Sequence, residues 1–381
     1  MKIAIVLEAV FPEDKGGLER WYFSLARYFA AAGHEVEYLN NSQVNGERGG
    51  VGYRTVTNWR WSYLPGGVRS IRQSIKFTWA LTKWMKTNRY DAIYLSSVPI
   101  ISIFTIPFIR LTAPRTTIIV EWLEFWPIRY WIAYKGFLLG LIGWTVQLFA
   151  AQLGNIKTTF VPRIYKPLNL TTVPWVGSRT VLLSGLCSSS AETMATAQAR
   201  RNDILFIGRL VDEKQPILAL EAVKRYMELG WAGKFWLIGT GPSEPAIRSY
   251  IAEHFLTDSA MLIANASDEI VKEKMDSSFV LLHPSKREGY GLVVVEAAAR
   301  GLPALLIDYP DNGAIDLNVT PELVADPGEI DSILGKLHFA DSNFERLSKE
   351  AKSWAENASH TRTMETSAEE ILKLFRSSRV V

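Results

Sequence analysis

Two carboxylates and two glycines occur close together between residues 284 and 303. Glu288 stands in a polar turn with Gly289 and Gly291, and Glu296 follows inside an apolar run of helical character. A Gly-x-Gly turn lets the backbone approach a ligand, and a helix N-terminus presents unpaired N–H groups to an anion. Carboxylates accept hydrogen bonds from sugar and ribose hydroxyls. The stretch therefore predicts a site for a phosphorylated, hydroxyl-rich ligand. The alternative is a loop with one capping and one surface glutamate.

A second group of polar residues follows an apolar strand in the same half of the chain. Gly208 and Arg209 end that strand, and Lys214 precedes a helix that Pro216 opens. This position is the carboxyl edge of a parallel sheet, where α/β proteins bind ligands. Two cations there suit a diphosphate leaving group, which gains charge as its bond to carbon breaks. The alternative is two solvated basic residues without a ligand. Glu288 and Glu296, which follow a later strand, make this alternative less favourable.

Alternating strands and helices must position these residues. Strand-like segments cover residues 2–7, 35–39, 92–95, 117–120, 180–183, 203–208, 234–239, 261–264, 279–282 and 304–307. The first helix begins at about Leu18, behind Gly16 and Gly17, whose N–H groups either face a phosphate or form a simple turn. The pattern predicts two doubly wound α/β domains. Residues 331–379 read as helices, and residues 184–198 as a linker or mobile loop that contains Cys187.

Composition bounds the class of protein. The 381 residues suffice for two domains, and 48% hydrophobic with 21% charged residues is typical of a globular chain. One cysteine excludes an internal disulfide framework and favours a reducing compartment. The first residues run straight into a strand without a secretory signal pattern, so a cytoplasmic location is expected.

Charge is distributed unevenly along the chain. Between Arg48 and Arg179 there are 17 Lys and Arg against three acids, a difference of +14, together with nine tryptophans. This combination favours an anionic membrane surface over nucleic acid, for which no binding motif is present. The apolar run 136–151 has 16 residues, fewer than the ~20 needed to span a bilayer. A core helix is the favoured interpretation of this run, and contact with the membrane interface is the alternative.

Several sequence segments together resemble one enzyme family. They are Phe206-Ile-Gly-Arg-Leu210 with Lys214, Leu237-Ile-Gly-Thr-Gly241, Pro284-Ser-x-x-Glu288-Gly-Tyr-Gly291 and the Glu288-x7-Glu296 pair. The chain is similar here to retaining glycosyltransferases of family 4, the glycosyl transferases group 1. The resemblance implies the α/β GT-B fold, with two doubly wound Rossmann-like domains facing each other across a cleft. Residues 1–180 would bind the acceptor and 181–358 the nucleotide-sugar. Residues 359–381 would form a helix that crosses back to the N-terminal domain.

The resemblance also implies roles for individual residues. Arg209 and Lys214 would hold the donor diphosphate, Glu288 the donor sugar, and Glu296 the ribose. The donor-binding set is Gly16, Gly17, Gly208, Gly239, Gly241, Asn265, Gly289, Tyr290, Gly291, Leu292 and Glu296, with Asn265 in a loop that borders the base. Arg209, Lys214 and Glu288 would be catalytic. No metal or other cofactor is expected, because the two cations neutralise the departing diphosphate.

One position departs from the family pattern. Many relatives carry a histidine after the strand at 117–120, where it contacts the donor sugar, whereas this chain has Leu123 and Glu124 there. Glu121 or Glu124 would substitute in the sugar contact, or form an ion pair with a nearby arginine. His283, directly after a strand, is a further candidate to line the cleft.

These features favour a retaining transfer of sugar from a nucleotide-sugar to a lipid-linked or glycolipid acceptor. The enzyme is expected to be peripheral on the inner face of the membrane. The alternatives are a sugar-nucleotide epimerase or hydrolase on the same fold, and a catalytically weak membrane-associated scaffold subunit. The sequence leaves open the nucleobase, the donor sugar, the acceptor, the linkage and the oligomeric state.

Overall fold

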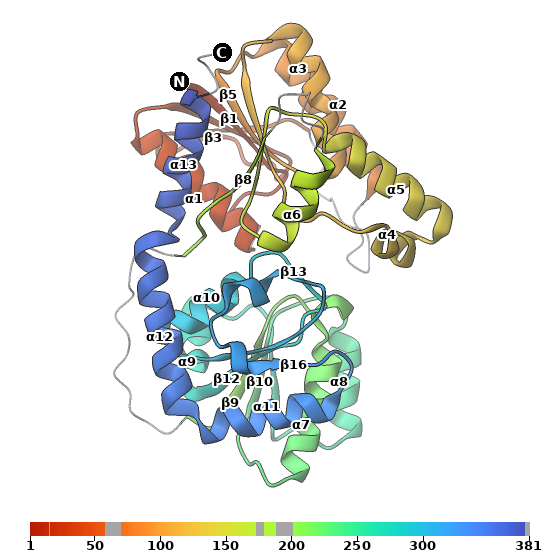
Figure 1. Ribbon diagram of the computed structural model, residues 1–381, viewed down its shortest axis with the longest axis vertical. Helices are drawn as coiled ribbons and strands as arrows, with labels where there is room; N and C mark the ends of the chain where they lie inside the picture. Colours follow the sequence, from red (N-terminus) through yellow and green to blue (C-terminus); the bar gives the residue numbers. More distant parts are fainter. Residues whose placement is uncertain (15, 58–69, 173–178, 188–200, 378–381) are drawn as a thin grey trace. The chain divides into compact units, whose positions relative to one another are not determined.

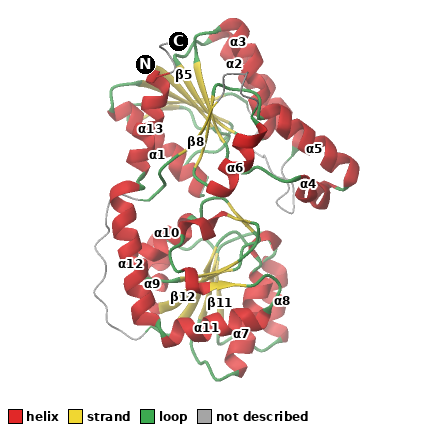
Figure 2. Ribbon diagram, in the orientation of Figure 1, coloured by secondary structure: helices red, strands yellow, loops and turns green. Residues whose placement is uncertain are grey.

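The structure, a computed structural model, describes residues 1–14, 16–57, 70–172, 179–187 and 201–377 (Figure 1). The chain divides into two units. Unit 1 contains the described residues up to Leu186 and those from Arg362 onward, and unit 2 contains the described residues from Cys187 to Thr361. Each unit is a sheet flanked by helices (Figure 2).

The strands of unit 1 form one sheet in the order β3-β4-β2-β1-β5-β6-β7-β8. They are β1 (Lys2–Val6), β2 (Glu35–Asn40), β3 (Gly46–Arg48), β4 (Val51–Thr55), β5 (Ala92–Ser96), β6 (Thr117–Glu121), β7 (Ile156–Thr159) and β8 (Arg179–Leu182). All neighbours pair in parallel except β3 and β4. The chain moves from β1 to β2 on one side and later returns to β5 on the other, which is the doubly wound pattern.

Helices connect these strands. They are α1 (Gly17–Ala31), α2 (Ile71–Thr87), the short helix η1 (Ile100–Thr105), α3 (Ile106–Thr112), α4 (Ile128–Lys135), α5 (Phe137–Ala150), α6 (Pro162–Thr171) and α13 (Met364–Ser377). The predicted face of α1 is confirmed, since Tyr22, Leu25 and Phe29 are fully buried. Phe375 of α13 contacts Phe29, with ring centroids 6.1 Å apart. The C-terminal helix therefore completes the core of unit 1.

Unit 2 has a six-stranded parallel sheet in the order β11-β10-β9-β12-β14-β16. Its strands are β9 (Asp203–Ile207), β10 (Phe235–Ile238), β11 (Ala260–Ile263), β12 (Ser278–His283), β14 (Ala304–Ile307) and β16 (Val324–Ala325), and β13 (Arg287–Glu288) pairs separately with β15 (Asp311–Asn312). Its helices are α7 (Pro216–Glu228), α8 (Glu244–Glu253), α9 (Asp268–Ser277), α10 (Leu292–Ala299), α11 (Ile330–Ser342) and α12 (Phe344–Thr361), with short helices η3 (Asp212–Lys214), η4 (Gly313–Leu317) and η5 (Pro321–Leu323). The predicted strands and the helical tail are thus confirmed within the described residues.

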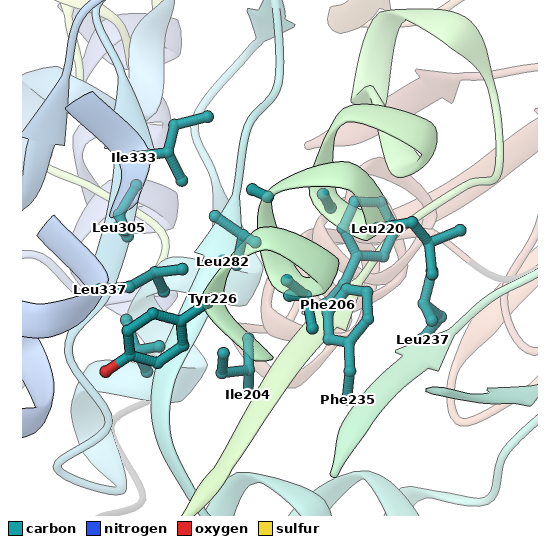
Figure 3. Close-up of a cluster of buried hydrophobic side chains, with 14 of the residues drawn as sticks. Ile204, Phe206, Leu220, Tyr226, Phe235, Leu237, Leu282, Leu305, Ile333 and Leu337 are labelled. Carbon is teal, nitrogen blue, oxygen red and sulfur yellow. The ribbon is translucent and has the colours of Figure 1, made fainter. Parts of the chain in front are cut away.

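One core layer of unit 2 lies between its sheet and the helices α7 and α11 (Figure 3), and a second involves α9, α10 and α12. The labelled side chains come from strands β9, β10, β12 and β14 and from these two helices: Ile204, Phe206, Leu220, Tyr226, Phe235, Leu237, Leu282, Leu305, Ile333 and Leu337. Burying each large apolar side chain contributes about 1.5–3 kcal/mol, so this layer fixes the strand order on which the site depends.

The division between the two units falls inside the predicted linker at residues 184–198, and its first four residues are held by hydrogen bonds and packing. Ser184 donates its backbone N–H to Glu370 Oε2 at 3.1 Å, and Gly185 donates to Ser367 Oγ at 3.1 Å. Cys187 is 3% exposed and packs in an apolar cluster of unit 2. Hydrogen bonds to α13 thus order a segment whose composition suggested mobility, while residues 188–198 lie outside the described residues.

Candidate active site

The strand order of unit 2 brings two loops together. The chain moves from β9 to β10 and β11 on one side, and β12 then pairs with β9 on the other. The β9–β12 junction is therefore the topological switch point, where open α/β sheets bind ligands. Hydrogen bonds connect the loops that leave β9 and β12 there. Lys286 donates its backbone N–H to the Glu213 carbonyl at 2.8 Å, and Arg287 donates to Glu213 Oε2 at 3.1 Å.

Two glycines hold the loop after β9 in position. Gly239 has φ +151°, and a Cβ added to it would lie 1.9 Å from the Gly208 carbonyl oxygen. A Cβ at Gly241 would lie 2.4 Å from the carbonyl oxygen of Leu210, whose own N–H donates to the Thr240 carbonyl at 2.9 Å. The loop after β10 thus packs backbone to backbone against the loop that carries Arg209.

We expect Gly239→Ala to destabilise unit 2 by about 2–4 kcal/mol, because the new methyl group overlaps the Gly208 carbonyl and the backbone is strained. The matched control is Gly335→Ala in α11, where nothing lies within 4 Å of the added Cβ. That substitution should stabilise the unit by about 0.5–1 kcal/mol. Urea unfolding measures both values. Equal effects of the two substitutions would contradict the close approach described for Gly239.

A connected group of charged and polar side chains occupies the switch point. Lys214 Nζ forms an ion pair with Glu288 Oε2 and also donates to the Arg287 carbonyl at 3.4 Å. His283 Nε2 lies 2.9 Å from Glu288 Oε2, and Ser285 Oγ lies 3.1 Å from the same nitrogen. The N–H of Gly289 donates to Glu288 Oε1 at 3.2 Å. Glu288 is thereby fixed from several directions.

Burial and these partners act in opposite directions on Glu288. Burial alone would raise the pKa of its carboxyl, but the Lys214 ammonium and the hydrogen bond from His283 hold that pKa well below its usual range. Burial lowers the pKa of His283 despite the neighbouring carboxylate, so its ring is neutral at pH 7. The site therefore contains one ionised carboxylate, one ammonium group and a neutral imidazole beneath them.

The N-terminus of α10 opens beside this group. Its N-cap is Gly291, with φ +85° and no side-chain cap. A Cβ there would lie 2.7 Å from that of Ala314, so the turn requires glycine. Leu292 is the first residue of α10, and Glu296 is exposed one turn later. The first N–H groups of such a helix carry partial positive charge and favour an anion.

Arg209 supplies the second cation. Its side chain is exposed in the loop that follows β9. Lys214 is already paired with Glu288, whereas the described residues give the Arg209 guanidinium no hydrogen bond or ion pair. The arrangement can bind a phosphate-bearing ligand through one uncommitted guanidinium, one shared ammonium group and a helix N-terminus.

The remaining predicted residues lie elsewhere. Asn265 is exposed, with φ +53°, after the edge strand β11, which β10 separates from β9. Gly16 and Gly17 belong to unit 1, where they form the uncapped start of α1 directly after the loop that follows β1. Tyr290 is half-buried in the loop before α10.

Glu121 and Glu124, at the end of β6 and in the loop after it, differ in their exposure to solvent. Glu121 is 0% exposed, so its carboxylate offers no surface to a sugar or an acceptor. It ends β6 beneath α1, where burial excludes the contact that its sequence position suggested. Glu124 retains exposed surface and is the acid of the pair that a ligand can reach.

Sequence reasoning missed the support beneath Glu288. His283 is 2% exposed and holds this carboxylate from below, a role different from lining a cleft. The short pairing of β13 with β15 fixes the backbone of the same turn. Neither the support by His283 nor the β13–β15 pairing follows from the local sequence pattern. The available signal was a histidine at the end of a buried strand, five residues before Glu288.

Comparison with known proteins agrees with this geometry. Residues 195–361 match the model of the family described as glycosyl transferases group 1. The chain is 32% identical over 127 residues to 2-deoxystreptamine glucosyltransferase of Streptomyces kanamyceticus, covering 33% of this chain and 32% of that one. It is 30% identical over 115 residues to the putative colanic acid biosynthesis glycosyltransferase WcaL of Escherichia coli, covering 29% and 28%. The matches thus span about a third of these relatives' length. The narrower assignment to family 4 is compatible with them and stays a prediction.

Solved structures share the fold of the whole chain. Sucrose-phosphate synthase from Thermosynechococcus elongatus superposes with a TM-score of 0.75 at 17% identity, covering 99% of this chain and 98% of that one. WaaG, a glycosyltransferase involved in lipopolysaccharide biosynthesis, gives 0.69 at 16% identity, covering 98% and 99%. Anabaena HepE in complex with UDP-glucose gives 0.71 at 13% identity, covering 99% and 100%. The expected GT-B fold class, with two Rossmann-like units, is confirmed.

Proposed function

We propose that the protein is a retaining glycosyltransferase that takes its sugar from a nucleotide-sugar and needs no metal. The observation that carries the proposal is the Lys214–Glu288 ion pair beside the N-terminus of α10 at the switch point of unit 2. The family match over residues 195–361 and the nucleotide-sugar in the HepE structure support it.

The donor would bind with its diphosphate against the cations. Arg209 and Lys214 would neutralise the phosphates, and the N–H groups of Gly291 and Leu292 would face the β-phosphate. Glu296 would accept hydrogen bonds from the ribose hydroxyls, and Glu288 from the donor sugar. Because Lys214 has three donors, it can keep its bond to Glu288 and still contact a phosphate oxygen.

The reaction then requires charge stabilisation more than a protein nucleophile. The acceptor oxygen forms a bond to the anomeric carbon on the face from which the phosphate departs. The bond between the anomeric carbon and the phosphate oxygen breaks. The leaving phosphate oxygen takes the acceptor's proton, so configuration is retained and the products are glycoside and nucleoside diphosphate. Arg209 and Lys214 lower the barrier because the charge on the leaving group grows as this bond breaks.

The acceptor would be a lipid-linked glycan or a glycolipid at the cytoplasmic surface of a membrane, with the enzyme bound peripherally. The +14 excess between Arg48 and Arg179 lies in unit 1 and favours an anionic surface. The fold is shared with WaaG, a glycosyltransferase involved in lipopolysaccharide biosynthesis. A sugar-nucleotide epimerase or hydrolase and a weakly active scaffold subunit are the alternatives.

The test is release of nucleoside diphosphate from UDP-, GDP- and ADP-sugars, with and without a total lipid extract. We expect release from one donor, stimulation by lipid, and loss of release in Arg209→Ala. The matched control is Arg225→Ala, an exposed arginine on the next helix, which should leave release unchanged. Free sugar formed regardless of lipid would favour the epimerase or hydrolase. No release by a folded protein across the panel would favour the scaffold.

A further inference from the structure

One element of unit 1 exposes an unusual amount of apolar surface. In α5 only Gly140, Gln147 and Ala150 are buried, whereas five large apolar side chains are each between 52% and 73% exposed. These are Phe137, Leu138, Leu139, Ile142 and Phe149. The favoured prediction of a core helix for residues 136–151 is therefore wrong for this face. Large contiguous apolar patches on a protein surface mark sites of interaction.

The exposed face belongs to a firmly packed hairpin, α4–α5, which projects from the side of unit 1 (Figure 1). A Cβ added to Gly140 would lie 2.6 Å from backbone atoms of Ile132, and one added to Gly143 would lie 2.4 Å from the Trp131 ring. These glycines let the two helices touch. Because the glycine side of α5 faces α4, the leucine and phenylalanine side is left outward.

A buried glutamine fixes the same hairpin. Gln147 Oε1 accepts from the Trp126 N–H at 3.0 Å and from Trp131 Nε1 at 3.2 Å, and its Nε2 donates to the Trp126 carbonyl at 2.8 Å. All polar atoms of this side chain are used inside the hairpin. The outward apolar face is therefore part of an ordered structure and needs no rearrangement to be presented.

The chemistry around this face points to its occupant. No acidic residue occurs from Phe125 to Ser190, while Arg129 and Lys135 lie on α4. The Trp126 ring packs against Tyr130, Trp131 and Tyr134, with centroids 4.6 to 5.5 Å apart. Aromatic rings with polar edges and basic side chains beside an apolar helix are the composition of elements that lie in a membrane interface.

The dimensions restrict the mode of contact. The 14 residues of α5 extend about 21 Å, less than the ~30 Å hydrocarbon core of a bilayer. None of the helices in the described ranges has the length and apolar character to cross a membrane. The hairpin can therefore enter one leaflet only.

We propose that the α4–α5 hairpin inserts the apolar face of α5 into an anionic phospholipid leaflet, with Arg129 and Lys135 at the headgroups. The proposal deepens the proposed function and rests on its membrane-bound acceptor. A second copy of the chain is a poorer occupant, because a symmetric contact would bring the same acid-free, basic surfaces together. Anionic headgroups neutralise these charges, and the acyl chains take up the leucine and phenylalanine side chains.

The test compares flotation of the full chain with phosphatidylcholine vesicles and with mixed phosphatidylcholine–phosphatidylglycerol vesicles. We expect binding to the anionic vesicles and a loss of about tenfold or more in the Leu138→Glu/Ile142→Glu variant. The matched control is Leu229→Glu/Phe255→Glu, two exposed apolar residues of unit 2, which should bind as the unmodified protein does. Circular dichroism checks that each variant is folded, as expected for exposed positions.

Three results would overturn the proposal. The first is no binding of the unmodified protein to either vesicle, and the second is equal loss in both variants. The third is concentration-dependent dimerisation that only the hairpin variant abolishes, which would assign the face to a second copy. Release of nucleoside diphosphate from a soluble nucleotide-sugar, measured without lipid, tests the transferase independently of membrane insertion. Vesicle binding without release of nucleoside diphosphate supports membrane insertion of the hairpin and counts against the transferase. Release without vesicle binding supports the transferase and counts against membrane insertion.

Discussion

Replacing Lys214 with alanine should lower the rate of sugar transfer by about two to three orders of magnitude. This is the loss expected when one preorganised group that stabilises developing negative charge is removed. The effect should fall mainly on kcat, because the charge of the leaving diphosphate increases only as its bond to the sugar breaks. Steady-state release of nucleoside diphosphate measures it. Lys224→Ala on α7 is the control, since that lysine pairs with Glu228 on the same helix, at 3.2 Å.

A purely structural role of Lys214 must be separated from this catalytic one. Lys214→Ala leaves the Glu288 carboxylate in place with His283 and the Gly289 N–H as its remaining partners among the described residues, which destabilises the turn. In the Lys214→Ala/Glu288→Gln double variant no unpaired charge remains, and we expect the melting temperature to recover while transfer stays slow. Recovery of both, or a single variant that retains a third or more of the rate, would contradict a role at the diphosphate.

Glu121→Gln should stabilise unit 1 at pH 8 by about 3 kcal/mol relative to its effect at pH 4. Burial raises the pKa of Glu121 to about 7, against smaller opposing effects of Tyr22, Trp21 and Tyr94. Neither oxygen of its carboxylate has a hydrogen-bond partner of normal geometry in the described part of the chain. An ionised carboxylate in such surroundings is costly, and glutamine removes the charge at nearly the same volume.

The direction of the pH dependence follows from the raised pKa. Below about pH 4.5 the carboxyl is protonated in both the folded and the unfolded chain, and its contribution to stability is fully present. As pH rises through 7 the unfolded chain has already lost its proton, so the folded state loses stability over this window. Burial raises the pKa of Tyr22 and Tyr94 well above their usual range, so both stay neutral there.

Urea titrations at several pH values measure this effect. Hydrogen exchange of the peptide that contains β6, read by mass spectrometry, follows the transition of unit 1 separately. Glu47→Gln on β3 is the control, because Glu47 is exposed in the same unit. A difference between Glu121→Gln and the unmodified protein that does not change from pH 4 to pH 8 would show that the pKa of Glu121 is the same in the folded and the unfolded chain, and would contradict the raised pKa.

The sequence by itself determined the elements and the resemblance to one family. Strand periods, helix faces and their glycine and proline boundaries are local properties, so β9, α7, β12 and α10 were predictable from short stretches of chain. The polar turn that contains Glu288 was recognisable for the same reason. Its residue types and spacing lie within a single loop and the start of the following helix.

The tertiary structure alone decided which of these residues meet. Lys214 and Glu288 are 74 positions apart, and they pair because β12 joins the sheet beside β9. Glu121 looked like a ligand contact in sequence, but burial beneath α1 is decided by packing. The apolar run of α5 gave no indication of which side faces protein, because leucines surround the helix. Gly140 and Gly143 set that side by allowing α4 to approach, and this contact between two helices is not encoded in the periodicity of either one.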